Sequence, residues 1–595
     1  MAGEKRRRDM GRIGFVAGIL AATLAWGQPV LRSTDPVVNG GSYAPGIAPG
    51  SIFVVFGTNL GGPDVVLNQS LPMRPELGGV SVRFTPVGGG TAINALMVYT
   101  TRNQVAGLLP SSAAPGDYNV TVTYNNQTSP AARVSVVARN FGVVSADSSG
   151  GGQAQVQNYR TGTEWDLNRV ARGRLGQYTT APANPGQVLV IWGTGLGADS
   201  ASDSNGGVSQ NFTANTRVIL AGREITPAYA GRSSGLPGTD QINFTLPADA
   251  PAGCSVPLQV RIGDSYSNTT YIAIAAAGRN ACQHPYLSEQ TLVRLSEGGT
   301  MVTGSFALLK QSTSVSVQGM ALDMVTESLS GSFQRVGVGG LADVSEGMDM
   351  PSGACQVYRS RGDQDVLLLG PPPVQPLDAG AQLTLNGPNA SNIAVPRDAD
   401  TRAYYKSLAQ TTSFPGGIPG LPGGLPNIPG LGSSGSPVIA QGTYTLRGTG
   451  GADVGAFSAT VTVPQPITWT NKSSISNITR SSGVTVTWSG GGSNDLVSIM
   501  GTSAQRVGGT DTRPVYQAVV FNCITNASAR TFTVPASVLT QLPADAGPEG
   551  MSVLGIQQFG DGQNGRFTAP LTAGGNTDFA LFNFSIGEMK SVSYR

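Results

Sequence analysis

The chain has 595 residues, of which 82 are glycine and only 12% are charged. An average soluble protein has about 25% charged residues, and this Gly-rich, charge-poor composition is typical of an all-β protein and not of a helical enzyme. At about 150 residues per domain, the length predicts roughly four domains. The apolar content of 39% argues against disorder over most of the chain.

The formal net charge of +2 originates in the N-terminal segment. Residues 1–27 carry five basic and two acidic side chains, so the rest of the chain has a net charge of −1. A nearly neutral chain lacks the excess of basic charge that is typical of nucleic-acid-binding proteins.

Residues 1–27 have the pattern of an export signal. A basic stretch, Lys5–Arg12, precedes an apolar run from Ile13 to Trp26, and small residues at 25 and 27 predict cleavage after Gly27. The run is shorter than the roughly 20 residues that span a bilayer, although an uncleaved anchor is an alternative. We therefore expect a secreted, periplasmic or cell-surface protein without a membrane span after signal cleavage.

The four cysteines fit an oxidising compartment. Cys254 and Cys282 lie close in sequence and are expected to form a disulfide. For Cys355 and Cys523 two alternatives remain, a bridge between distant modules or free buried thiols.

Two stretches of the chain, Pro49–Gly61 and Pro185–Gly197, share one pattern. Each is a Pro-Gly turn, an apolar β-branched and aromatic run, and a glycine-punctuated loop, which predicts a buried sandwich strand. The spacing recurs at offsets of 136, 137, 137 and 137 residues for Gly57 and Gly193, Gln104 and Gln241, Pro110 and Pro247, and Gly116 and Gly253. This is an internal repeat, predicting module 1 at 28–139 and a connection plus module 2 at 140–278.

The two copies also carry the motifs of a known module: Ala48–Ser51, Phe56–Gly61, Asp240–Asn243 with Pro247, and Pro251–Gly253. Both resemble immunoglobulin-like modules of the IPT/TIG type, and more closely the repeated module of many exported acidobacterial proteins. The first copy departs from that pattern at Arg102–Val105. The resemblance covers about residues 36–276 and implies an exported immunoglobulin-like protein without a particular activity.

The remaining sequence predicts three further modules. Residues 279–374 read as a small β-rich module with one short helix at Leu287–Leu295, followed by a β-module at 375–465. The latter is interrupted by a Pro/Gly-rich loop at 414–437, expected to be disordered, and residues 466–595 predict a C-terminal β-sandwich. The expected fold class is all-β, with tandem immunoglobulin-like β-sandwich modules and Gly/Pro-rich loops.

Few enzyme classes fit this sequence, because His284 is its only histidine. A Ser-His-Asp or Cys-His site would have to use His284, which lies two residues after Cys282 and is expected to be a surface residue beside a disulfide. Acid pairs such as Asp398 and Asp400, or Asp363 and Asp365, share one face if they lie on strands, but neither has an evident apolar setting that would raise one pKa.

The loop Gly193–Ala198 comes close to a dinucleotide-binding pattern. That pattern needs a following helix N-terminus, whereas the residues after Asp199 are turn-forming. Asp199, Asp203 and Asn205 offer oxygens that suit a weak Ca²⁺ site, with a plain solvated loop as the favoured alternative.

Aromatic residues give the remaining candidate site. Tyr159, Trp165 and Tyr178 lie in the polar connection and suit a platform for stacking sugar rings. The alternative for Trp165 is a plug between modules. Three further tryptophans lie in strand patterns and are expected in cores: Trp192, Trp469 and Trp488.

The sequence thus predicts a non-catalytic binding or scaffolding protein of the cell surface or extracellular space, similar in role to an adhesin. No catalytic, cofactor-binding or metal-binding residue is assigned, and no cofactor. The expected partner is a protein or a polysaccharide at the cell surface. A carbohydrate-binding accessory protein is the first alternative, and a hydrolase with an unrecognised site is the second.

Overall fold

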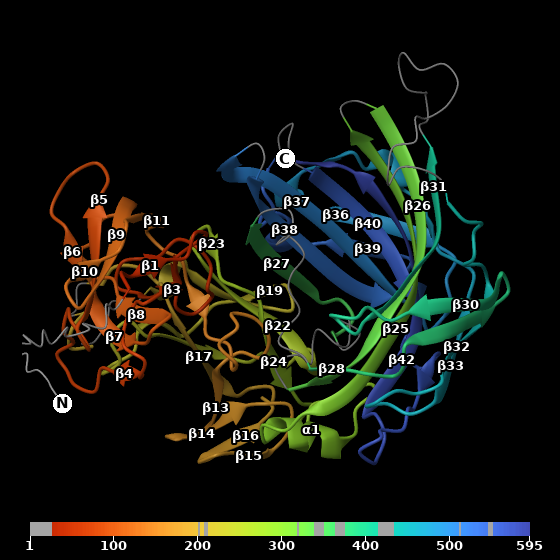
Figure 1. The fold of residues 1–595 in the computed structure, drawn as a ribbon, viewed down its shortest axis with the longest axis horizontal. Coiled ribbons are helices and arrows are strands. Elements are labelled where there is room, and N and C mark those ends of the chain that lie inside the picture. The colour runs from red at the N-terminus through yellow and green to blue at the C-terminus, as the bar shows by residue number, and fades with distance from the viewer. Residues whose placement is uncertain are drawn as a thin grey trace, which may run out of the picture.

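The structure is a computed structural model that describes residues 27–199, 203–206, 212–317, 320–337, 350–362, 375–413, 434–510, 513–544 and 551–595. The predicted export signal, apart from Gly27, lies outside the described residues, as do Asp363, Asp365 and most of the loop predicted at 414–437. The fold class is all-β, as expected, with antiparallel sheets packed in layers (Figure 1).

Module 1 is a sandwich of a six-stranded and a five-stranded sheet. The order is β1-β3-β8-β7-β4 with β2 beside β3 in the first sheet, and β10-β9-β5-β6 with β11 beside β9 in the second. Alternation in β9 buries Tyr118, Val120 and Val122 against the first sheet. Asn125 and Asn126 both have positive φ and form the hairpin turn between β9 and β10. The strands are β1 Val30–Leu31, β2 Val37–Asn39, β3 Ile52–Thr58, β4 Val66–Leu67, β5 Val80–Pro86, β6 Ile93–Asn94, β7 Leu96–Thr100, β8 Gln104–Leu108, β9 Gly116–Tyr124, β10 Gln127–Thr128 and β11 Ala132–Val136.

Module 2 repeats this sandwich and confirms the internal repeat. Its central strands β17-β21-β20 match β3-β8-β7, and β22, flanked by β18 and β24, matches β9, flanked by β5 and β11. The predicted connection 140–184 supplies further strands to the same sheet, which becomes eight-stranded in the order β15-β16-β14-β13-β17-β21-β20 with β12 beside β17. The strands are β12 Gly142–Val143, β13 Val156–Thr161, β14 Glu164–Asn168, β15 Gly173–Leu175, β16 Tyr178–Ala181, β17 Val188–Thr194, β18 Thr216–Leu220, β19 Arg223–Ile225, β20 Tyr229–Arg232, β21 Asp240–Thr245, β22 Gly253–Ile262, β23 Ser265–Tyr266 and β24 Thr270–Ile274.

The C-terminal half is organised around one ten-stranded sheet in the order β27-β38-β37-β40-β42-β25-β26-β28, with β31 beside β26 and β41 beside β42. Strand β42 runs parallel to β25, and the other neighbours are antiparallel. The elements are α1 Glu289–Ser296, β25 Met301–Val317, β26 Met320–Val336, β27 Cys355–Gly362, β28 Gln375–Leu377, β29 Gln382–Gly387, β30 Ala390–Pro396, β31 Tyr404–Ser413, β32 Gly442–Gly448, β33 Phe457–Val463, β34 Thr468–Trp469, β35 Asn477–Ile478, β36 Val484–Ser489, β37 Leu496–Thr510, β38 Arg513–Asn526, β39 Thr531–Val534, α3 Ala536–Leu539, β40 Met551–Phe559, β41 Arg566–Phe567, β42 Phe579–Ser591 and β43 Ser593–Tyr594. Short 3₁₀ helices lie at Thr213–Asn215, Lys472–Ser474, Arg480–Ser482 and Ala527–Ala529.

This sheet crosses the module boundaries predicted at residues 374 and 465. Its strands come from all three predicted C-terminal modules, so these residues form one body. The long hairpin β25–β26 is rich in Ser, Thr and Gln, and only its long-range pairing with β42 and β31 makes it the middle of a sheet. Two smaller sheets, β30-β29-β32-β33 and β34-β36-β39, cover parts of it and enclose two cores.

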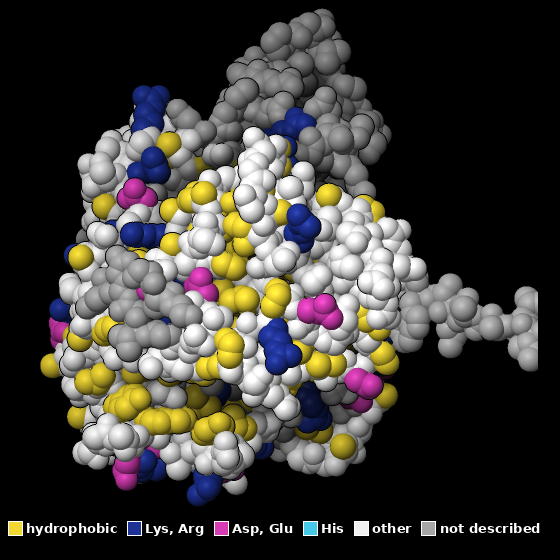
Figure 2. All heavy atoms as spheres, turned by 90° about the vertical axis from the view of Figure 1, so that its left-hand side faces the viewer, with side chains coloured by type: hydrophobic (Ala, Val, Ile, Leu, Met, Phe, Trp, Pro, Cys, Tyr) yellow, Lys and Arg dark blue, Asp and Glu magenta, His cyan; other side chains and the backbone are white. Residues whose placement is uncertain are grey.

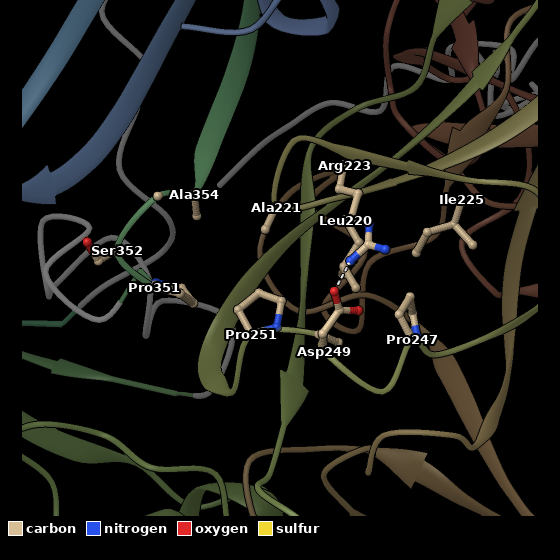
Figure 3. A pocket seen from close by; sticks show the side chains of 12 residues that line it. Leu220, Ala221, Arg223, Ile225, Pro247, Asp249, Pro251, Pro351, Ser352 and Ala354 are labelled. Atoms are coloured by element: carbon tan, nitrogen blue, oxygen red, sulfur yellow. Dashed lines mark hydrogen bonds and ion pairs between the residues drawn. The ribbon is translucent and has the colours of Figure 1, made fainter. Parts of the chain in front are cut away.

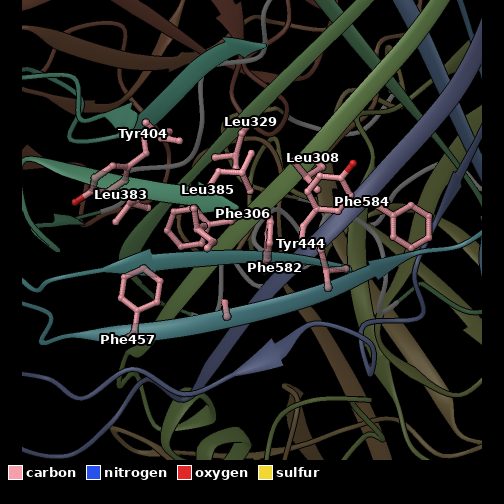
Figure 4. Close-up of a cluster of buried hydrophobic side chains, with 14 of the residues drawn as sticks. Phe306, Leu308, Leu329, Leu383, Leu385, Tyr404, Tyr444, Phe457, Phe582 and Phe584 are labelled. Atoms are coloured by element: carbon pink, nitrogen blue, oxygen red, sulfur yellow. The ribbon is translucent and has the colours of Figure 1, made fainter. Parts of the chain in front are cut away.

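The larger of these cores shows how the layers interlock (Figure 4). Phe306 of β25, Leu329 of β26 and Phe582 of β42 come from the ten-stranded sheet. Leu385 of β29 and Tyr444 of β32 are contributed by the small sheet that faces it. Burying such side chains contributes about 1.5–3 kcal/mol each, so this contact is a main source of stability for the C-terminal body.

Two disulfides are present. Cys254 on β22 is bonded to Cys282, as expected, and Cys355 on β27 is bonded to its cross-strand partner Cys523 on β38. The first bridge ties module 2 to the segment leading into α1. That helix begins as expected, because the Ser288 side chain accepts a hydrogen bond from the N–H of Thr291.

Candidate functional site

Module 2 has an outward face on its eight-stranded sheet. On β17, Leu189 and Ile191 point into the core, so Val188, Val190 and Trp192 lie on the opposite face, because successive side chains of a strand alternate. We define the aromatic face as the outward side chains of Gln157, Tyr159, Trp165, Tyr178, Val188, Trp192, Tyr229, Gln241 and Asn243.

The three aromatic residues predicted as a sugar platform lie side by side on this face. Tyr159 on β13 is the cross-strand partner of Trp165 on β14 and of Val188 on β17. The parallel pairing of β14 with β16 brings Tyr178 beside Trp165, with ring centroids 5.6 Å apart and an interplanar angle of 28°. Tyr178 is 44% exposed, so the pair is part of the surface and Trp165 does not act as a plug between modules.

Amide side chains border the aromatic row. Gln157 and Asn243 are both cross-strand partners of Val190, and Gln241 is the partner of Trp192. The Gln241 Nε2 donates to Asn243 Oδ1 at 2.9 Å, which fixes both amides in orientation.

Trp192 corrects one sequence expectation. It lies half-buried on the outward side of β17, whereas a core position was predicted, because its neighbours Leu189 and Ile191 occupy the core. Trp469 and Trp488 are buried as expected, as cross-strand partners.

The composition of the aromatic face suits a polyhydroxylated ligand. Aromatic rings offer apolar surface to the C–H face of a sugar, and the amides offer donors and acceptors for its hydroxyls. Figure 2 shows hydrophobic side chains gathered in a strip low on the face of the molecule that it draws.

The glycine loop Gly193–Ala198 has a structural role. The N–H groups of Gly195 and Leu196 donate to Oδ2 of Asp240, at 2.7 and 2.8 Å, so a carboxylate of the chain itself occupies the position a phosphate would take in a nucleotide site. Gly195 has φ +113°, and a Cβ there would collide with the carbonyl oxygen of Asn140.

Asp240 also forms a buried ion pair with Arg232, whose guanidinium donates to Oδ1 of the carboxylate. The Asp240 side chain is fully buried, and Arg232 also donates to the carbonyl of Gly197 at 3.1 Å. Burial raises the pKa of Asp240 to about 6, against the lowering effect of Arg232 and of the two backbone donors.

The same loop is part of the junction with module 1. Thr194 Oγ1 accepts from the Ile52 N–H at 2.8 Å, and Asn39 Nδ2 donates to the carbonyls of Asn140 and Thr194 at 2.7 and 3.2 Å.

Asp203, weighed above as a calcium ligand, accepts from the N–H and hydroxyl of Ser111 at 2.8 and 2.7 Å. Among the described residues, no group of three or more His, Cys, Asp or Glu side chains is placed to hold a metal ion.

His284 is buried, with 8% exposure, and is not the surface residue expected. Its Nδ1 accepts the N–H groups of Tyr286 and Leu287 at 3.1 and 3.2 Å, and its ring packs edge-on to Tyr286. Burial, with a smaller effect of Arg566, lowers its pKa to about 4. His284 therefore caps a chain turn before α1 as a neutral imidazole.

The acid pair Asp398 and Asp400 lies in a turn and not on a strand. Asp398 Oδ1 accepts from the N–H and hydroxyl of Thr401, both at 2.8 Å, and these bonds hold the pKa of this exposed carboxyl below its usual range. The low pKa argues against a general acid at this position.

A small pocket of about 200 Å³ lies between module 2 and the segment 350–354 (Figure 3). Its walls carry Pro247, Pro251 and Pro351, and the side chains of Arg223 and Asp249 pair beside it at 2.6 Å. Both charged side chains are more than half exposed, so they are satisfied by water and by each other.

No family model and no curated protein matches the chain. Among solved structures, it is similar to SGBP-B of a mixed-linkage glucan utilization locus of Bacteroides ovatus in complex with a mixed-linkage heptasaccharide, at 12% identity and TM-score 0.20, covering 66% of this chain and 69% of that one. An SGBP-B from a xyloglucan utilization locus in Bacteroides uniformis gives 9% identity and TM-score 0.16, covering 64% and 86%. Domains 5–6 of the S-layer protein SbsC give 16% and 0.15, covering 42% and 99%. Similarities of this size carry no conclusion about function.

Among the described residues, no helix has the length and hydropathy required to cross a bilayer.

Proposed function

We propose that this chain is an exported, non-catalytic binding protein of the cell surface or extracellular space, and that its ligand is a polysaccharide held on the aromatic face. The observation that carries the proposal is the placement of Tyr159, Trp165 and Tyr178 side by side on one outward sheet face, next to oriented amides. This arrangement favours a polysaccharide over a protein partner, because the amides and tyrosine hydroxyls offer many hydrogen-bonding groups beside apolar rings.

The compartment is supported by the covalent chemistry. Two disulfides bond all four cysteines, which suits an oxidising environment outside the cytoplasm. The predicted signal at residues 1–27 agrees with export. The repeated strand order of modules 1 and 2 also suits the proposed relationship to repeated modules of exported acidobacterial proteins.

A scaffolding contribution is favoured by the junction between modules 1 and 2. Asn39, Asn140 and Thr194 connect the two modules by side-chain to backbone hydrogen bonds that are buried or partly buried. Junctions of this kind hold modules at a fixed angle, so that the aromatic face is presented in a constant direction.

The test is retention of residues 28–595 on a panel of insoluble polysaccharides and on the envelopes of the producing cells. The variants are Trp165→Ala and Tyr178→Ala, and the matched control is Tyr405→Ala, which removes another exposed tyrosine, on β31 of the C-terminal body. Truncating a central aromatic contact costs about 2 kcal/mol, or roughly thirtyfold in affinity, so both variants should lose retention while the control keeps it.

If the native chain is retained on a polysaccharide and both variants are retained equally well, the aromatic face is not the binding site. Retention on envelopes alone would favour the adhesin-like reading over polysaccharide binding. Failure of the native chain to bind either material would contradict the proposed function.

A further inference from the structure

A cleft of about 960 Å³ lies where module 1, module 2 and the C-terminal body meet. This volume lies in the range of roughly 300–1,000 Å³ that is usual for small-ligand sites. Module 1 contributes Arg32 and Tyr43 to its walls, module 2 contributes Tyr266 and Tyr271, and β27 contributes Tyr358 and Arg359. It is separate from the aromatic face, with which it shares no residue.

Hydrogen bonds between the bodies hold the cleft open in one shape. The Tyr271 hydroxyl lies 2.7 Å from that of Tyr358 and donates to Gln356 Oε1 at 2.9 Å. Thr269 donates from its hydroxyl to the carbonyl of Val357. The walls from module 2 and β27 are therefore fixed before a ligand arrives, which lowers the conformational entropy lost on binding.

Arg359 is the unusual group in the cleft. Its Nη1 donates to the carbonyl of Ser267 at 3.2 Å, its Nη2 donates to Gln541 Oε1 at 2.7 Å, and its guanidinium lies 5.3 Å from the centre of the Tyr266 ring. All these partners are neutral. Within the described part of the chain, no carboxylate lies within ion-pair distance of Arg359. A largely buried cation without a counter-ion is costly, and burial lowers the pKa of Arg359 to about 10.

The module 1 wall carries a second guanidinium, on the exposed side chain of Arg32. Arg32 donates to the carbonyls of Thr34 and Asp35 at 2.8 and 2.6 Å, and it lies 4.7 Å from the centre of the Phe56 ring. Two acidic residues also line the cleft: Asp264 is exposed and Asp35 is half-exposed, so water screens the charge of each.

We propose that this cleft binds an acidic oligosaccharide, whose carboxylate or sulfate group pairs with Arg359 while the tyrosines contact its sugar rings. A guanidinium presents planar paired donors that match either anion, and the pairing supplies the counter-ion that the described residues do not. The proposal does not depend on the aromatic face, because no residue is common to the two sites.

The test is calorimetric titration of the full mature chain with three hexasaccharides: hexagalacturonate as the carboxylated probe, a heparin hexasaccharide as the sulfated probe and cellohexaose as the neutral one. We expect binding of at least one acidic probe, weakened as NaCl is raised, and at least tenfold weaker binding of cellohexaose. Binding of hexagalacturonate alone assigns a carboxylate ligand, and binding of the heparin fragment alone assigns a sulfate ligand. Absence of binding to both acidic probes, or equal binding of cellohexaose, would overturn the proposal.

Three variants locate the site. Arg359→Gln should weaken binding of the acidic probe at least tenfold. Arg359→Gln also removes the hydrogen bond from Arg359 to Gln541. Two variants of opposite charge at Thr34, an exposed residue that lines the cleft, therefore test the charge of the site without changing that contact. Thr34→Lys should tighten and Thr34→Glu should weaken binding by several-fold, whereas Trp165→Ala should have no effect. Identical affinities for the two Thr34 variants would place the bound anion elsewhere.

Discussion

The buried pair of Asp240 and Arg232 gives the sharpest test of what holds the glycine loop Gly193–Ala198 in place. The substitution Asp240→Asn keeps the shape of the side chain and removes its charge. In the native structure the carboxylate accepts from Gly195, Leu196 and Arg232. An amide has only one oxygen for these donors and no negative charge, so the buried Arg232 loses its ion pair with this side chain.

The size of the effect follows from burial. The side chains of Asp240 and Arg232 are 0% and 5% exposed, and breaking such a pair by removing one partner costs about 3–5 kcal/mol. The exposed pair of Asp249 and Arg223, with side chains 70% and 60% exposed, serves as the control within the same module. Asp249→Asn should cost less than about 1 kcal/mol, because water already solvates both groups.

The assay is hydrogen exchange of the β17 amides, followed by mass spectrometry at neutral pH. Exchange through local opening reports the free energy of that opening, so 3–5 kcal/mol corresponds to an acceleration of roughly 10²- to 10⁴-fold in Asp240→Asn. Adding Arg232→Met removes the buried cation that has lost this carboxylate, and the double variant should exchange more slowly than the single one.

The reasoning is refuted if Asp240→Asn accelerates exchange no more than Asp249→Asn does. It is also refuted if adding Arg232→Met gives a further acceleration, because the cost would then lie in lost packing and not in the buried cation.

Two further predictions concern stability. Burial lowers the pKa of His284 to about 4, so between about pH 6.5 and 4 this side chain takes up a proton only in the unfolded chain. The folded state therefore loses about 3 kcal/mol of stability as the pH falls through this window. The melting temperature of the native chain should fall relative to that of His284→Gln, and equal pH profiles of the two would contradict a buried neutral imidazole. The Cys355–Cys523 bridge closes 168 residues and the Cys254–Cys282 bridge closes 28, which by loop-closure entropy corresponds to about 5 and 3.5 kcal/mol. Replacing both cysteines of a pair by serine should therefore lower the midpoint of denaturant unfolding more for Cys355–Cys523 than for Cys254–Cys282. The reverse order would show that the entropy of the unfolded chain does not account for the stabilisation by these disulfides.

Several features of the fold could be predicted from the sequence because they depend on neighbouring residues. A few adjacent residues determine each of three such features: the alternation in β9, the Asn125-Asn126 turn and the Ser288 cap of α1. The repeat of modules 1 and 2 was visible because equal spacing of turns and strands preserves the same sandwich.

Part of the candidate site could be predicted in the same way. Tyr159, Trp165 and Tyr178 stood out as aromatic residues in a polar stretch, but their alignment in one row could not be deduced. It arises from the parallel pairing of β14 with β16, and parallel register leaves no local signal. Trp192 was misplaced for a related reason: a continuous apolar run does not reveal which of its residues face outward.

The sequence by itself determined the all-β class, the duplicated module and the type of residue available for binding, since these follow from composition and short-range periodicity. Tertiary structure alone decided which charges are buried and which strands share a sheet. His284 and Asp240 are buried by packing against distant elements, and β25 pairs with β42 across most of the C-terminal half. The physical reason is that burial and pairing depend on contacts between residues far apart in the chain, whose free energies are set only when the whole body is assembled.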